Sequence, residues 1–182
     1  MIPVGYMAKK VIKRPDRIKA ERVEDIYSVS NCGSNDFADY INYWKHNGFW
    51  FFDSPEIIQD VAKDNKIDMS GNRFFYYEAF DKQYDEAAQT WNDFKPEASF
   101  TTNVLVPILK TLEGYDVVTF SGSTDPGCSP LSCNNLAESI DVNEHCLLPS
   151  FEEAKALLEG GAFNKGEPGP YRIFAVYSLP EN

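Results

Sequence analysis

The chain of 182 residues is 43% hydrophobic and 25% charged, a composition typical of one compact folded domain rather than of a disordered chain. Its 17 basic and 28 acidic residues give a net charge of −11, which disfavours nucleic acid and anionic membranes as partners because both attract basic surfaces. No apolar run is long enough to span a membrane, and the first residues lack the basic-then-apolar order of a secretory signal, so we expect a cytoplasmic protein.

The basic residues are spread unevenly along the chain. Residues 1–22 carry a net charge of +5, from seven basic and two acidic groups, whereas the remaining residues carry −16. This asymmetry predicts a basic N-terminal strand or arm. Such a segment either docks on an anionic partner or lies over the protein's own acidic surface, and we favour the second interpretation.

Two stretches of the chain follow one pattern. A shift of 96 positions brings residues 31–80 into register with residues 127–176 without a gap. Within each stretch, apolar residues recur at the spacing of an amphipathic helix, at 37–44 and at 133–140. The pattern therefore indicates an internal duplication.

Each stretch continues with a short apolar run, at 49–52 and at 145–148, which we interpret as a buried strand. A second helix is expected after Ser54 and after Ser150, because serine is a favoured N-cap residue. The outer strands of the two halves are expected at 23–30 and 75–80, and at 115–121 and 171–176.

These elements predict an α+β fold in one compact domain, with an antiparallel or mixed sheet and helices packed on it. It would contain two pseudo-repeated β-α-β-α-β halves, at about 23–80 and 115–178, with the second half running on to residue 182. Residues 81–114 would connect them, with a hairpin between Tyr84 and Trp91.

Four cysteines, at positions 32, 128, 133 and 146, are expected to be free thiols in the cytoplasm. Together with His145, three of them resemble a zinc set. If 145–148 is a strand, however, His145 and Cys146 point to opposite faces and cannot bind one ion. We therefore expect neither a metal nor a cofactor.

Cys32 and Cys128 are candidate catalytic nucleophiles. Each follows an expected strand and precedes an expected helix, and a helix N-terminus can lower the pKa of a thiol. A nucleophile of this kind also needs a base, and the chain has only His46 and His145. A structural role is the favoured interpretation for both histidines.

The aromatic runs at 49–52 and 74–77 contain more rings than one sheet face can bury, so one face is covered by the other half or is open to a ligand or partner. The candidate contact residues are Trp50, Tyr76, Asn47, Asn143 and His145.

The leading hypothesis is a non-enzymatic binding protein. It would engage a basic protein partner, as inhibitor or immunity proteins do, or a small ligand between its two halves. The alternatives are an enzyme that uses Cys128 or Cys32 and a homodimer that pairs through its aromatic face. The chain has no P-loop, HExxH, GxSxG or GxGxxG motif that favours a particular reaction.

Overall fold

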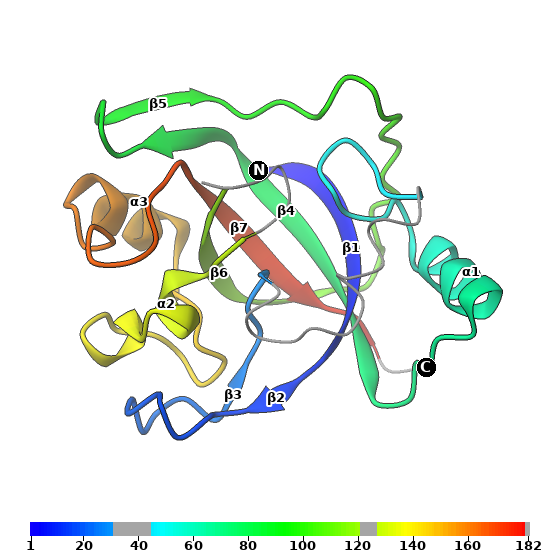
Figure 1. Ribbon diagram of the computed structural model, residues 1–182, viewed down its shortest axis with the longest axis horizontal. Helices are drawn as coiled ribbons and strands as arrows, with labels where there is room; N and C mark the ends of the chain where they lie inside the picture. Colours follow the sequence, from blue (N-terminus) through cyan, green and yellow to red (C-terminus); the bar gives the residue numbers. More distant parts are fainter. Residues whose placement is uncertain (31–44, 121–126, 181–182) are drawn as a thin grey trace.

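The computed structural model describes residues 1–30, 45–120 and 127–180. In this part of the chain it confirms the α+β class, with an antiparallel sheet of five strands and three α-helices (Figure 1). The strands of this sheet are β1 (Ile2–Lys10), β4 (Asn72–Asp85), β5 (Thr90–Asp93), β6 (Thr111–Thr119) and β7 (Tyr171–Ser178). The helices are α1 (Pro55–Asn65), α2 (Pro130–Cys133), α3 (Phe151–Glu159) and a 3₁₀ turn, η2 (Leu136–Glu138). A separate two-stranded ribbon pairs β2 (Ile12–Lys13) with β3 (Asp25–Ile26).

The main sheet runs in the order β1-β4-β7-β6, and β5 forms a hairpin with the far end of the long strand β4. At the centre of the sheet Tyr77 of β4 pairs with Val176 of β7. The other neighbour of Tyr77 is Gly5 of β1, and the other neighbour of Val176 is Gly114 of β6. Both outer strands bulge immediately before this glycine. The two edges of the sheet are therefore built in the same way.

The core lies on both faces of the sheet, because successive residues of a strand point to opposite sides. Phe174 belongs to an aromatic cluster that also buries Phe51 and the inner face of α1, at Ile58. Its neighbour Ile173 belongs to a second cluster, which buries the inner faces of α2 and α3. As Figure 1 shows, α1 lies on the side of β1, whereas α2 and α3 lie together on the opposite side.

The two predicted helix starts after Ser54 and Ser150 are confirmed. Pro55 is the first residue of α1, where its missing N–H costs no hydrogen bond. At the start of α3, the Ser150 hydroxyl accepts a hydrogen bond from the backbone N–H of Glu153, as a serine N-cap does. The α1 helix ends at Lys66, which adopts a left-handed conformation with φ of 56°.

The predicted strands at 49–52 and 145–148 are wrong. Both runs are tight turns, because Trp50 and Cys146 have φ angles of 66° and 62° and interrupt the extended backbone. Only isolated bridges remain, from Phe52 to β1 and from Leu148 to β6.

Two further elements differ from expectation. Within 23–30, only the two residues of β3 form a strand. The helix expected at 133–140 is divided into α2 and η2, and Asn135 between them is left-handed. The helix expected at 37–44 lies outside the described residues. Within the described ranges, no helix is both long and apolar enough to cross a bilayer.

Candidate functional site

A groove with a volume of about 780 Å³ opens between segments that are distant in the sequence. Its lining comes from the first part of α1, from the turn into β4 and the start of β4, from the segment before β6 and from the residues that follow β7. The lining residues are Pro55, Glu56, Gln59, Gly71, Asn72, Arg73, Phe74, Pro107, Leu109, Leu179 and Pro180. This volume is that of a typical small-molecule site.

The groove has four polar lining side chains, Glu56, Gln59, Asn72 and Arg73. The Arg73 guanidinium donates a hydrogen bond of 2.7 Å to the hydroxyl of Tyr27 and lies over its ring. The side-chain oxygen of Asn72 is buried and accepts no hydrogen bond. On the helix wall, hydrogen bonds from Ser54 and from its own backbone N–H lower the pKa of Glu56, so its carboxylate is ionised at neutral pH. The groove thus combines a mostly apolar lining with one cation and one anion.

The segment that leads into β6 exposes large apolar side chains. Ile108 is 98% exposed and Leu109 is 69% exposed, and Leu105, Val106 and Leu112 are each about half exposed. Contiguous apolar exposure of this kind marks a binding surface more often than a chance feature. We call residues 105–112 the apolar segment.

The apolar segment is attached to the sheet at both ends. The backbone N–H of Leu105 donates to the carbonyl of Asp53, and the hydroxyl of Tyr6 donates to the carbonyl of Leu105. At the other end, the Lys110 ammonium lies 2.5 Å from a carboxylate oxygen of Glu78. The segment is therefore a fixed wall of the groove.

Tyr76, a predicted contact residue, takes part in the attachment of Lys110 to Glu78. Its ring and that of Tyr177 lie 4.6 Å and 4.2 Å from the Lys110 ammonium. The hydroxyls of both tyrosines donate to Glu78. Tyr76 is itself buried and does not line the groove.

Asn47 and Asn143, also predicted as contact residues, organise the two tight turns. The side-chain oxygen of Asn47 accepts from the backbone N–H groups of Phe49 and Phe51. That of Asn143 accepts in the same way from His145 and Leu147. These hydrogen bonds give both asparagines a structural role within their turns.

His145 and Trp50 lie apart from the groove and from each other. The His145 ring stacks on Tyr27 at 4.0 Å, with Nδ1 2.6 Å from a carboxylate oxygen of Asp25. Trp50 stacks on His46 at 4.4 Å. The structure therefore does not bring the five predicted contact residues into one site.

Cys128 is buried, and its thiol lies 3.6 Å from the side-chain oxygen of Asn134. It lines neither the groove nor the smaller cavity beside Trp50. Cys32 lies outside the described residues. Burial raises the pKa of Cys146 to about 12, so this thiol is not a nucleophile at neutral pH. Among the described residues, no group of three or more acidic, histidine or cysteine side chains is arranged to hold a metal ion.

A buried polar cluster, which the sequence pattern did not reveal, lies between β1 and β6. The Lys9 ammonium donates to the carbonyls of Ser28, Val29 and Ser30, at 2.7, 2.7 and 2.8 Å. One Asp116 oxygen accepts from the hydroxyl of Ser129 and from the backbone N–H of Val29. Lys9 stands beside Lys10 in the basic N-terminal stretch, which is typical of an exposed segment. Because β1 is buried at every position from Val4 to Lys9, alternation along the strand could not have indicated its burial either.

The comparisons of the chain with protein families, with curated proteins and with solved structures found no significant match.

Proposed function

We propose that the chain is a non-catalytic binding protein whose groove takes a small, largely apolar ligand. The observation that carries the proposal is the groove of about 780 Å³ beside the apolar segment. Its lining is mostly proline, leucine and phenylalanine, which favours an apolar body in the ligand. Arg73 and Glu56 favour a polar group at one end of that ligand.

We also propose that the groove lies between two halves related by a pseudo-twofold axis. The sheet pairings support this, because β1 meets β4 in the same register as β6 meets β7. The axis would pass through the pair Tyr77 and Val176, so that β4 corresponds to β7 at a shift of 99 positions. In this arrangement β1, and not the stretch 23–30, is the counterpart of β6. The groove is lined by α1 and β4 from one half and by the residues that follow β7 from the other.

The test uses the fluorescent apolar probe 1-anilinonaphthalene-8-sulfonate, together with two neighbouring variants. Leu109 lines the groove, whereas Ile108 is 98% exposed and does not line it. We expect saturable fluorescence enhancement with the wild-type protein. The Leu109→Asp variant should weaken this binding by about tenfold or more, because a charge then lies in the apolar wall. The Ile108→Asp variant should leave it unchanged.

Equal binding by all three proteins would overturn the small-ligand proposal. Equal loss in both variants would instead indicate that the apolar segment acts as an exposed patch. Sedimentation of the same samples then decides whether a second copy covers this patch.

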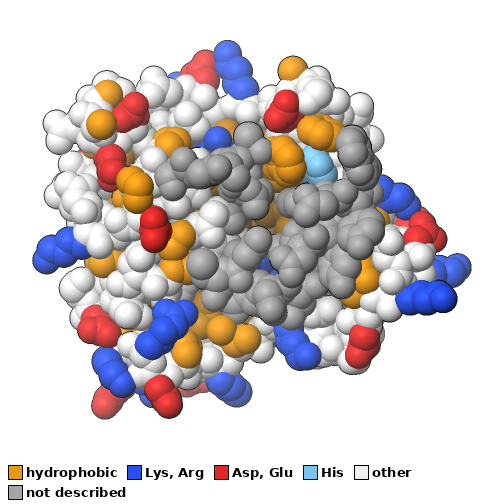
Figure 2. Space-filling model, viewed as in Figure 1, with side chains coloured by type: hydrophobic (Ala, Val, Ile, Leu, Met, Phe, Trp, Pro, Cys, Tyr) orange, Lys and Arg blue, Asp and Glu red, His pale blue; other side chains and the backbone are white. Residues whose placement is uncertain are grey.

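A basic protein partner draws no support from the face in Figure 2, where acidic and basic side chains are interspersed. A pull-down with the wild-type chain and with the Ile108→Asp variant tests that alternative.

A further inference from the structure

A second, smaller cavity of about 110 Å³ lies beside the Asn47 turn. It is lined by residues 48–50 of that turn, by Phe94, Lys95 and Glu97 from the segment after β5, and by Arg172 of β7. It shares no lining residue with the groove. The two sites are therefore separate.

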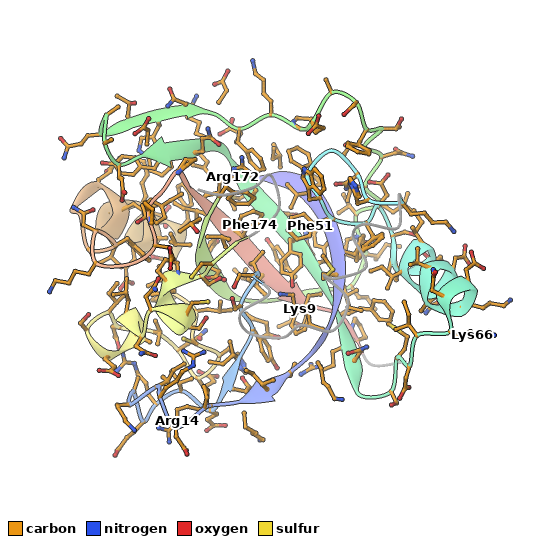
Figure 3. The ribbon with its side chains drawn as sticks, viewed as in Figure 1. Lys9, Arg14, Phe51, Lys66, Arg172 and Phe174 are labelled. Atoms are coloured by element: carbon orange, nitrogen blue, oxygen red, sulfur yellow. The ribbon has the colours of Figure 1, made fainter. Side chains whose placement is uncertain are left out.

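Arg172 is held rigidly at the wall of this cavity. Its guanidinium carbon lies 3.9 Å from the centre of the Phe94 ring and 3.6 Å from that of Phe120. One edge of the guanidinium, through Nε and Nη2, donates to the side-chain oxygen of Gln83 at 3.2 and 3.1 Å. In Figure 3, Arg172 and Phe174 follow each other along β7, with Arg172 toward the β4–β5 hairpin.

The guanidinium of Arg172 is not neutralised by an ion pair in the part of the chain that the structure describes. Within residues 1–30, 45–120 and 127–180, no carboxylate forms an ion pair with it, although the chain has 28 acidic residues. Glu97 lines the same cavity, but one of its carboxylate oxygens accepts from the Ser99 hydroxyl at 2.8 Å. Burial lowers the pKa of Arg172 to about 9, which leaves it charged at neutral pH. Nη1 donates to no described residue.

Trp50 brings a second unused donor to the cavity wall. Its indole N–H is buried and makes no hydrogen bond, and its ring stacks on His46 and meets Phe100 edge to face. Buried donors without partners are rare in folded proteins, because each costs the hydrogen bond it made with water. Lys95, whose side chain is 79% exposed, also lines the cavity, and its ammonium pairs with the carboxylate of Asp93 at 3.5 Å.

We propose that this cavity binds a small oxyanion, a carboxylate or a phosphate group. The anion would accept hydrogen bonds from Nη1 of Arg172 and from the indole N–H of Trp50. Arginine suits this role because its planar guanidinium can stack between two rings while its edge still donates. The Glu97 carboxylate opposes binding, so a dissociation constant of about 1 mM is expected for a free anion.

The test titrates the protein separately with sodium acetate and with sodium phosphate, with sodium chloride at matched ionic strength as the control. The readout is the indole N–H signal of Trp50 in the ¹H–¹⁵N spectrum, assigned with a Trp50→Phe variant. We expect a saturable shift with at least one oxyanion and none with chloride. The oxyanion that saturates the shift at the lower concentration indicates whether the natural ligand carries a carboxylate or a phosphate.

Two variants complete the test. Arg172→Met keeps a long apolar side chain between Phe94 and Phe120 but removes the donor, and it should weaken binding about tenfold or more. Lys13→Gln removes one exposed positive charge from β2, outside the cavity lining, and should bind as the wild type does. If Arg172→Met does not fold, the rise in melting temperature with phosphate is compared between Trp50→Phe and the wild type, and a smaller rise in the variant is expected.

An equal shift with chloride, no shift with either oxyanion, or unchanged binding in a folded Arg172→Met variant would overturn the proposal. An equal rise in the melting temperatures of Trp50→Phe and the wild type would overturn it as well. None of these outcomes bears on the groove, because the two sites share no residue.

Discussion

Asn47 and Asn143 make matching hydrogen bonds at opposite edges of the sheet. The side-chain nitrogen of Asn47 donates to the carbonyl of Val4, and that of Asn143 donates to the carbonyl of Glu113. Each accepting residue precedes the glycine at the bulge of its outer strand. Each asparagine therefore links a tight turn to an edge strand by a hydrogen bond, and these two hydrogen bonds lie on opposite sides of the proposed axis.

We expect Asn47→Ala to destabilise the protein more than Asn143→Ala. Asn47 is buried and donates additionally to Asp53 at 2.9 Å, whereas no such fourth hydrogen bond is found for Asn143 among the described residues. With about 1 kcal/mol for each net hydrogen bond, the losses are about 4 and about 3 kcal/mol. Urea unfolding measures both, and Asn92→Ala on exposed β5 is the control. Equal losses for all three variants would contradict a role for these side-chain hydrogen bonds.

Gly5 and Gly114 should not tolerate alanine. Their φ angles are +134° and +147°, and a Cβ on Gly5 would lie 2.6 Å from the carbonyl oxygen of Phe52. The corresponding distance from Gly114 to the carbonyl oxygen of Leu148 is 2.8 Å. We expect each alanine variant to lose about 3 kcal/mol or more, from backbone strain and overpacking together.

Gly71 separates these two effects. Its φ is also positive, at +78°, but a Cβ there would meet only the side chain of Lys10, at 3.7 Å. Gly71→Ala should therefore lose about 1 kcal/mol, from the backbone term alone. Thermal unfolding of the three variants provides the comparison. A loss at Gly71 as large as that at Gly5 would show that steric contact is not the cause.

The sequence predicted those parts of the fold that depend on local chemistry. Ser54 and Ser150 marked the helix starts correctly, because capping is decided within one turn of the chain. The runs at 49–52 and 145–148 were misread, because an apolar run does not reveal a left-handed residue at its second position. The helix starts of the two halves are related by a shift of 96 positions, whereas the proposed axis relates β4 to β7 by a shift of 99. The second half therefore has three more residues between helix and strand than the first, and a comparison without gaps cannot show this difference. Trp50 was expected as a contact residue, but Arg172 was not, because only the tertiary fold brings the turn at 48–50 and β7 to one cavity.

The attachment of Lys110 to Glu78 should stabilise the wall of the groove. Burial opposes ionisation of Glu78, but hydrogen bonds from Lys110 and Tyr177 outweigh it and lower its pKa. We expect Glu78→Gln to cost about 2 kcal/mol, because it leaves a half-buried ammonium without its anion. Amide hydrogen exchange in residues 104–110 should also become faster.

An exposed ion pair provides the control for this variant. Lys82 and Asp93 lie 3.2 Å apart, with side chains that are 42% and 61% exposed. Asp93→Asn should therefore leave the free energy of unfolding nearly unchanged, because solvent screens this pair. If the two variants lose the same stability and exchange in 104–110 is unchanged, Glu78 does not hold the apolar segment in place.

Asp116 should make the stability of the protein depend on pH in the weakly acidic range. Burial raises its pKa from 3.8 to about 6, although hydrogen bonds from Ser129 and Val29 and the charge of Lys9 act in the opposite direction. Between these two pKa values the folded state binds more protons than the unfolded state, so stability falls as the pH rises from about 4 to about 6. Below this window both states are protonated, and above it the full cost of the buried charge, roughly 3 kcal/mol, is present.

The variant Asp116→Asn removes this titration while it retains an oxygen that can accept from Ser129 and Val29. The new amide N–H₂ group takes the position of the Asp116 oxygen that is buried without a hydrogen bond. The free energy of unfolding of the variant can therefore be lower than that of the wild type at a given pH. The decisive quantity is thus the difference in free energy of unfolding between variant and wild type, measured by urea unfolding at several pH values. This difference should move in favour of the variant by roughly 3 kcal/mol between about pH 4 and about pH 7. Asp60→Asn on the exposed face of α1 controls for the loss of one carboxylate. A difference that stays constant over this range would mean that Asp116 is ionised throughout it, and that Lys9 and the two hydrogen bonds offset the cost of its burial.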